Sequence, residues 1–168
     1  MNQTEKWISW LTSNDERKWK KATLALGDLS CDSDVDVPSL ISALDSEVDD
    51  VVFWCIGALG ALGERSVDAI DKLIELTDSE CLGVKQASIS SLSRIGPDNV
   101  ELNHFLVRKL SDSDDLFVCD VLRAFIAMNT VGDDEIETIK RCLTHSSSHV
   151  AFQAEVTLRN IMLTTKDA

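Results

Sequence analysis

The sequence lacks the short motifs that usually reveal an enzyme. It contains no Gly-rich phosphate-binding loop, no G-x-S-x-G and no H-E-x-x-H, which argues against the common nucleotide-binding, serine-hydrolase and zinc-protease sites. Its most closely spaced glycines, Gly57, Gly60 and Gly63, lie within or at the end of an apolar helical stretch instead. We therefore expect no catalytic residue and no bound cofactor.

Long apolar runs are also missing. No apolar segment follows a basic N-terminal start, and none reaches the length of a membrane-spanning helix. We therefore expect a cytoplasmic protein with no secretory leader and no membrane partner.

Disulfide patterns, prolines and strand signals are scarce. The cysteines form no C-x-x-C pair and are odd in number, which indicates reduced thiols. With two prolines and 5% aromatic residues, the turns must be made by Gly, Asp, Ser and Asn. No sustained alternation of apolar and polar residues is bounded by hairpin turns, so the pattern predicts an all-α chain. The five cysteines are Cys31, Cys55, Cys81, Cys119 and Cys142.

Positive charge is in short supply. Sixteen basic residues stand against 29 acidic ones, which gives a formal net charge of -13. So acidic a surface repels nucleic acid and anionic membrane as a whole, although a local basic stripe could still bind a strand. Apolar content of 44% and charged content of 27% in 168 residues are typical of one globular domain with a sizeable core.

What the chain does contain is a 33-residue repeat. Each copy begins with a short helix A, continues through a polar turn, and ends with a helix B. The approximate units are 4–36, 37–69, 70–102, 103–135 and 136–168, which we expect to form a single domain over residues 1–168. Two apolar columns mark the repeat: Leu26, Leu59, Leu92, Phe125 and Leu158 in the first, and Leu29, Leu62, Ile95, Met128 and Ile161 in the second.

Two further columns predict how the helices end and pack. Gly63 and Gly96 occupy the position just past helix B, where a left-handed cap favours glycine, and Asn129 stands at the same position in unit four. A column of small residues in helix B should let neighbouring helices approach closely. Its members are Ala25, Ala58, Ser91, Ala124 and Thr157.

Helix B of units two and three carries a family resemblance. The segments Val51–Gly63 and Val84–Gly96 match the pattern V-R-x-x-A-A-x-A-L-G-x-I-G, with Lys85 in place of the usual Arg in unit three. The chain therefore resembles the HEAT-like repeat family, including PBS-lyase HEAT-like proteins. The resemblance implies an armadillo-type right-handed α-α superhelix, a solenoid of five HEAT-like helix pairs. It also implies a protein-binding scaffold whose concave groove is lined by the B helices. Trp19, Val52, Val118 and Ala151 replace the Arg elsewhere, so we expect no Asp–Arg ladder along the array.

The apolar helix of unit two leaves part of its surface unexplained by the repeat. A step of 100° per residue places Phe53, Gly57 and Gly60 opposite the core face, with Trp54 beside them. Two interpretations are open: this side contacts a partner, or neighbouring B helices bury both rings. The expected partner-binding residues are Phe53, Trp54, Gly57, Lys20, Cys119, Arg123, Phe152 and Val156.

Two other clusters could each be a functional site or an ordinary part of the surface. Lys20, Arg123 and Arg159 should face the groove, where they would form either a basic binding surface or an ordinary solvated face. Cys142-x-x-His145-x-x-x-His149 has zinc-like spacing, but no fourth ligand is evident and the segment spans a turn, so we expect no metal site.

The function expected from these features is a non-enzymatic protein–protein interaction scaffold. It would bind a protein or peptide in the concave groove, and an acidic surface could favour a basic partner. The alternatives are a nucleic-acid-binding or DNA-glycosylase-like protein, a phycobilin-lyase-like subunit, and a homodimer formed through the apolar helix of unit two.

Overall fold

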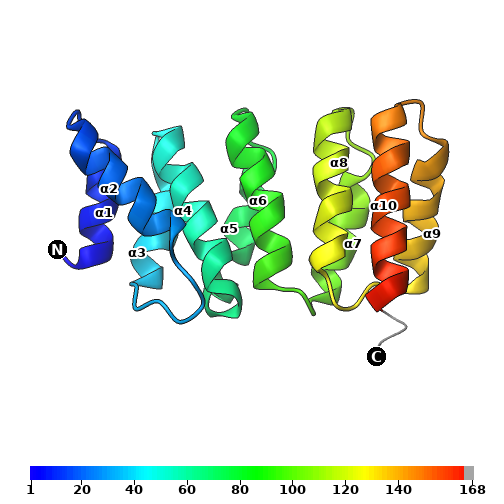
Figure 1. The fold of residues 1–168 in the computed structure, drawn as a ribbon, viewed down its shortest axis with the longest axis horizontal. Helices are drawn as coiled ribbons and strands as arrows, with labels where there is room; N and C mark the ends of the chain where they lie inside the picture. Colours follow the sequence, from blue (N-terminus) through cyan, green and yellow to red (C-terminus); the bar gives the residue numbers. More distant parts are fainter. Residues whose placement is uncertain (165–168) are drawn as a thin grey trace. The chain divides into compact units, whose positions relative to one another are not determined.

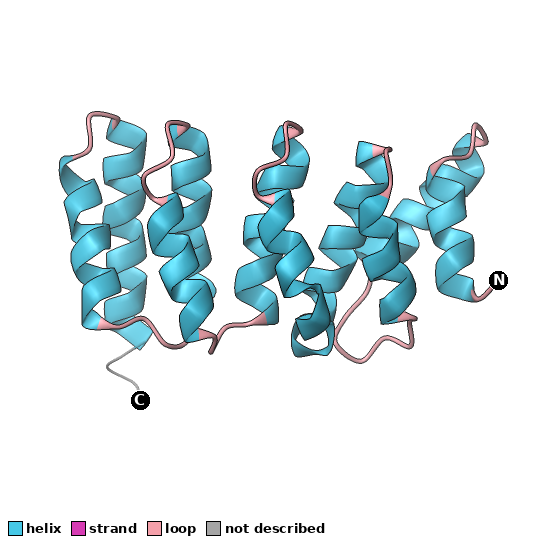
Figure 2. Cartoon of the chain, turned by 180° about the vertical axis from the view of Figure 1, so that it is seen from behind, coloured by secondary structure: helices cyan, strands magenta, loops and turns pink. Residues whose placement is uncertain are grey.

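The computed structural model describes residues 1–164, and this part of the chain contains helices and no strand. Residues 1–164 form ten α-helices in five successive pairs. Figures 1 and 2 show these helices as ribbons from opposite sides. Short 3-10 segments extend some of them, at Ala43–Asp45, Gly63–Ala69, Phe125–Ala127 and Cys142–Thr144. The α-helices are α1 (Gln3–Leu11), α2 (Glu16–Gly27), α3 (Val37–Ser42), α4 (Asp49–Leu62), α5 (Ile70–Leu76), α6 (Leu82–Ile95), α7 (Val100–Lys109), α8 (Asp115–Ala124), α9 (Asp133–Arg141) and α10 (Ser148–Thr164).

The chain divides into two compact units, Met1–Ile95 and Gly96–Ala168. The first unit holds three helix pairs, α1 with α2, α3 with α4, and α5 with α6; the described part of the second holds α7 with α8 and α9 with α10. The predicted all-α architecture of paired helices is confirmed. The single domain over residues 1–168 stays a prediction. No helix among residues 1–164 combines the length and the apolar character that crossing a membrane requires.

The repeat columns form the core of each unit. All five residues of the first column are buried, and so are four of the five in the second, where only Leu29 is half-buried. A period of 33 residues places the same face of helix B inward in every copy, so the apolar columns supply the main burial energy.

Small residues bring successive B helices close together. The Ser91 hydroxyl donates a hydrogen bond to the Ile56 carbonyl oxygen at 3.0 Å, and the Thr157 hydroxyl donates to the Leu122 carbonyl oxygen at 2.9 Å. Ser91 and Thr157 share one repeat position, and each reaches 35 residues back to the preceding B helix. The small-residue column therefore permits close approach, and its hydroxyls satisfy their hydrogen-bonding capacity on a neighbouring backbone.

The helix ends differ from the expected glycine caps. Gly63 ends α4 at the predicted position with φ of 59°, although its ψ of -135° lies outside the left-handed helical region. The prediction for Gly96 is wrong, because Gly63 is the one residue with positive φ in the described chain. Pro97 explains the difference: a residue before proline is held in extended conformations and away from the helical region. Asn129 also lacks positive φ; its N–H donates to the Pro97 carbonyl oxygen at 2.8 Å.

The acidic linker between α2 and α3 is held in place by one arginine. The Nη1 atom of Arg65 donates to the carbonyl oxygens of Cys31 and Ser33, both at 2.7 Å. At the end of the linker, the backbone N–H of Asp36 donates to the Thr4 hydroxyl at 3.0 Å. The linker is therefore fastened to both neighbouring helix pairs of its unit.

Candidate functional site

Helix α4 is apolar nearly all round, and most of it is buried. Asp49 and Asp50 occupy its first turn, where negative charge suits the positive end of the helix dipole. Phe53 is 40% exposed, Trp54 is half-buried and Gly57 is exposed. The side of α4 that the repeat does not explain therefore faces solvent at Phe53 and Gly57. The expectation for Gly60 is wrong, because this glycine is buried against Ser91 of α6.

The two aromatic rings of α4 are held in a fixed arrangement. Their centroids lie 5.6 Å apart with an interplanar angle of 86°, the edge-to-face geometry that aromatic pairs favour. A Cβ atom on Gly83 of α6 would lie 3.7 Å from Phe53 Cδ2, and one on Gly27 of α2 would lie 3.5 Å from Trp54 Cζ3. Each ring thus packs against a glycine of a neighbouring helix B, one on either side of α4, and leaves part of its surface exposed.

Leucines extend the exposed apolar surface onto both neighbouring helices. Leu24 of α2 is 64% exposed and precedes Gly27 by one helical turn; Leu82 of α6 is exposed beside Gly83. We call Leu24, Phe53, Trp54, Gly57 and Leu82 the apolar strip; all five lie in the compact unit Met1–Ile95. The sequence interpretation did not select Leu82, although a signal was present. It occupies the repeat position at which repeats one, two and four carry an acidic residue, namely Glu16, Asp49 and Asp115.

The expected binding residues of the second compact unit differ in their exposure to solvent. Phe152 of α10 is 66% exposed, and Val156 one turn later is half-buried. The expectation that Cys119 faces solvent is wrong, because this residue is buried. Helix α8 buries a wider arc than one helical stripe, and its buried residues include Phe117, Val118, Cys119, Val121 and Leu122.

The basic residues expected in the groove are exposed, but each lies beside an acid on its own helix. Lys20 Nζ is 2.6 Å from Glu16 Oε1, and Arg159 Nη2 is 2.9 Å from Glu155 Oε1. Arg123 pairs with Asp120 in the same way. Exposed pairs of this kind add at most about 1 kcal/mol to stability, but each acid offsets the positive charge that a polyanion would meet.

The buried thiols are poor nucleophiles. Burial raises the pKa of Cys55 to about 12. Burial also raises the pKa of Cys142 and of Cys119, and in Cys119 the positive charge of Arg123 opposes the shift. These thiols stay protonated near neutral pH.

The zinc-like segment makes local contacts instead of converging on one point. Within residues 1–164, no three His, Cys, Asp or Glu side chains are placed to hold a metal ion together. The Cys142 thiol lies 3.7 Å from the Thr138 carbonyl oxygen, and His145 Nδ1 accepts from the Ser147 N–H at 3.1 Å.

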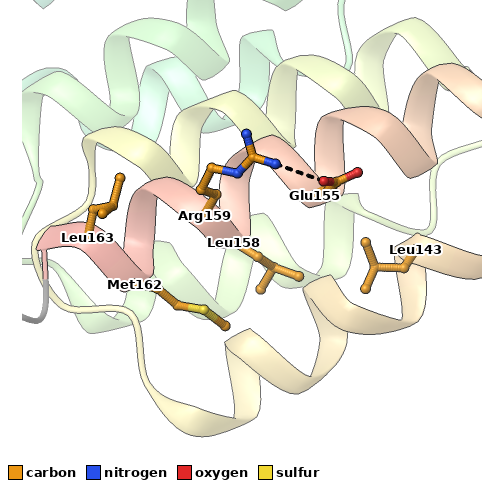
Figure 3. Close-up of a pocket in the computed structure, with 6 residues that line it drawn as sticks. All are labelled: Leu143, Glu155, Leu158, Arg159, Met162 and Leu163. Carbon is orange, nitrogen blue, oxygen red and sulfur yellow. Dashed lines mark hydrogen bonds and ion pairs between the residues drawn. The ribbon is translucent and has the colours of Figure 1, made fainter.

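A separate apolar pocket of about 380 Å³ lies on α10 (Figure 3). Its floor is aliphatic, and the ion pair between Glu155 and Arg159 lies along one side, as Figure 3 shows. Leu143 is exposed at this pocket. The aliphatic residues of the pocket are Leu143, Leu158, Met162 and Leu163.

Comparison with protein families gives a match to HEAT repeats over residues 4–93. Comparison with curated proteins gives no match.

Among solved structures, the chain is similar to CpcE and CpcF of phycocyanin lyase from Nostoc sp. PCC7120, at 24% identity and a TM-score of 0.70, covering 97% of this chain and 66% of that one. It is also similar to an engineered protein, at 20% identity and a TM-score of 0.61, covering 96% of this chain and 80% of that one. A third is a computationally designed armadillo repeat protein for modular peptide recognition, at 15% identity and a TM-score of 0.58, covering 95% and 82%.

At these identities the structural similarities establish the fold alone. The family match covers more than half of the 168 residues, and it includes Leu26, Leu59 and Leu92 of the first apolar column. This chain therefore belongs to the HEAT-repeat family.

Proposed function

We propose that the chain is a non-enzymatic interaction module that binds a protein or peptide segment on the apolar strip. The observation that carries the proposal is the exposure of Leu24, Phe53 and Leu82 on three successive B helices. Exposed apolar side chains that gather on one face are typical of protein interaction sites.

The aromatic pair suits the role of an anchor. Phe53 and Trp54 hold each other edge to face and rest on glycines of both neighbouring helices, so little side-chain entropy remains to be lost on binding. No atom lies within 4 Å of the position that a Cβ on Gly57 would take, so a partner can approach the backbone of α4 closely.

Further contacts in the proposal come from outside the strip. Lys20 lies on α2. A second contact surface on the compact unit Gly96–Ala168 is offered by Arg123, Phe152 and Val156. A designed armadillo repeat protein of similar fold is described as one for modular peptide recognition, which supports peptide binding as a use of this architecture.

The test introduces a charge at the centre of the strip without disturbing the fold. Gly57→Glu adds a side chain in open space and replaces a helical glycine, so the protein should fold at least as well as the parent. Val67→Glu is the matched control, because Val67 is also exposed and apolar but belongs to the segment Gly63–Ala69. Partners captured from the native cell should be lost with Gly57→Glu and with Phe53→Ala, and retained with Val67→Glu. Retention of every partner by both strip variants would refute the proposal.

The alternatives have direct tests of their own. The ion pairs of Lys20, Arg123 and Arg159 and the net charge of -13 oppose nucleic-acid binding, so a gel shift at low salt should give no complex. A lyase-like role, suggested by the fold of the phycocyanin lyase structure, requires a change in bilin absorbance when the protein is added. Light scattering at rising concentration tests self-association through α4.

A further inference from the structure

A second cleft lies between α7 and α9, within the second unit. It has a volume of about 490 Å³ and is formed by the first turn of α9, the segment before it and the facing side of α7. Three carboxylates and the side-chain amide of Asn103 contribute hydrogen-bond acceptors to its lining. The lining includes Asn103, His104, Thr130, Asp133, Asp134 and Glu135. We call it the α7–α9 cleft.

Glu135 is a buried carboxylate with too little positive charge around it. It is only 7% exposed, and its one ion-pair partner within residues 1–164 is His104, at 3.6 Å between Nε2 and Oε1. That pair carries charge on both sides only when the histidine is protonated. A Cβ atom on Gly132 would lie 2.7 Å from Glu135 Oε2, so the glycine leaves room for the carboxylate. The helix dipole of α9 offsets part of the burial penalty, but a buried carboxylate still favours a cationic hydrogen-bond donor.

Asn103 adds an unused acceptor to the same cleft. This residue is 1% exposed, and its amide nitrogen donates to the Thr130 carbonyl oxygen. Its Oδ1 atom is buried and has no donor in the described part of the chain. Buried side-chain oxygens are nearly always hydrogen-bonded, so an unpaired one on a residue that lines the same cleft as Glu135 indicates a missing donor.

The chemistry that fits these groups is a guanidinium. It is permanently charged, it presents five N–H donors in one plane, and it binds a carboxylate through two parallel hydrogen bonds while leaving donors for other acceptors. A compact ammonium has no such fork. Asp133 and Asp134 are exposed at the entrance, where their charge attracts a cation.

We propose that the α7–α9 cleft binds an arginine side chain of a partner polypeptide, with the guanidinium on Glu135 and Asn103. This site is separate from the apolar strip. In Figure 1, α8 and α10 face the viewer and α7 and α9 lie behind them, so the cleft belongs to the A-helix side of the second unit. The proposal does not depend on the function proposed for the strip.

The test is a titration of the ¹⁵N-labelled protein, followed by NMR, with N-acetyl-arginine methylamide as the probe. Saturable shifts are expected in residues 99–104 and 129–136. N-acetyl-lysine methylamide and magnesium chloride at matched ionic strength should produce clearly weaker responses. An equal response to the lysine probe or to magnesium would overturn the assignment to arginine.

Variants connect the response to the cleft. Glu135→Gln removes the charge and keeps the shape, and should weaken arginine binding about tenfold, the scale of a charge-assisted hydrogen bond. Glu101→Gln is the matched control, because this acid is exposed on α7 and does not line the cleft. Gly132→Ala is a second variant, since its backbone φ of -83° suits alanine while the added Cβ must displace the Glu135 carboxylate. Unchanged binding in both cleft variants, with spectra that report an intact fold, would refute the proposal.

Discussion

Two glycines one turn apart in α4 should respond in opposite ways to the same substitution. A Cβ atom on Gly57 meets no atom within 4 Å. On Gly60 it would lie 2.5 Å from Ser91 Oγ, 2.9 Å from Ser91 Cβ and 3.1 Å from Ser91 Cα. We predict that Gly57→Ala stabilises the protein and that Gly60→Ala destabilises it.

The magnitudes follow from two competing effects. Replacing a glycine by alanine inside a helix contributes about 1 kcal/mol of stability, because the unfolded chain loses backbone freedom. Gly57→Ala should show this gain in full. At Gly60 the new methyl group also requires α4 and α6 to move apart, since two of its three close contacts are with the Cα and Cβ of Ser91. Overpacking of this kind costs about 1–3 kcal/mol and disrupts the bond from Ser91 to the Ile56 carbonyl, so the net loss should be about 1–2 kcal/mol.

Urea denaturation measured with two probes tests the pair. All four tryptophans lie in the first unit, so their fluorescence reports the unfolding of that unit, while far-UV circular dichroism reports both units. The fluorescence midpoint should rise for Gly57→Ala and fall for Gly60→Ala, with similar m-values. The tryptophans are Trp7, Trp10, Trp19 and Trp54.

A double variant separates steric conflict from other causes. In Gly60→Ala with Ser91→Gly, the contacts to Oγ and Cβ disappear and only the contact to Cα remains, so part of the loss at Gly60 should be recovered. The reasoning is refuted if Gly60→Ala is as stable as Gly57→Ala. It is also refuted if Ser91→Gly lowers stability equally in the presence of Gly60 and of Ala at that position.

Three further predictions concern single contacts. Thr157→Val keeps the side-chain shape but removes the buried hydrogen bond to the neighbouring helix, and should lower the free energy of unfolding by about 1 kcal/mol in urea titrations followed by circular dichroism. Arg65→Ala should speed limited proteolysis within residues 30–36, whereas Arg94→Ala, also an exposed arginine of the first unit, should not. Above pH 9.0 the Cys55 thiol ionises in the unfolded chain, whereas in the folded protein it stays protonated up to a pH of about 12. The free energy of unfolding should therefore fall with rising pH more steeply in the parent than in Cys55→Ala, by about 1.4 kcal/mol per pH unit. Equal slopes in the two proteins would contradict burial as the cause of the raised pKa.

Much of the fold was predictable because a repeat buries the same positions in each copy. Leu59 and Leu92 are buried at equivalent places, and the helix pairs follow from apolar spacing and polar turns. The predictions were wrong where a neighbouring residue or helix changes the conformation or burial that a repeat position has in other copies. Pro97 prevents Gly96 from acting like Gly63, and the wide buried arc of α8 includes Cys119.

The candidate site was predictable only in part. The apolarity of Phe53 and Trp54 beyond the needs of the repeat was visible in the sequence, and both rings do reach the surface. Their binding role stays a prediction. The glycines that support the rings, Gly27 and Gly83, lie on other helices, so nothing in the pattern of α4 itself pointed to them.

The sequence by itself determined the period, the pairing of helices and the membership in the HEAT-repeat family, because these depend on spacing along one chain. Tertiary structure decided which apolar groups of α4 remain exposed and how closely the next helix approaches, as Gly57 and Gly60 illustrate. It also brought Asn103 of α7 and Glu135 of α9 to one cleft, although 32 positions separate them in the sequence. Exposure and charge balance depend on neighbours that are distant in the sequence, so a periodic pattern identifies the core more reliably than the functional surface.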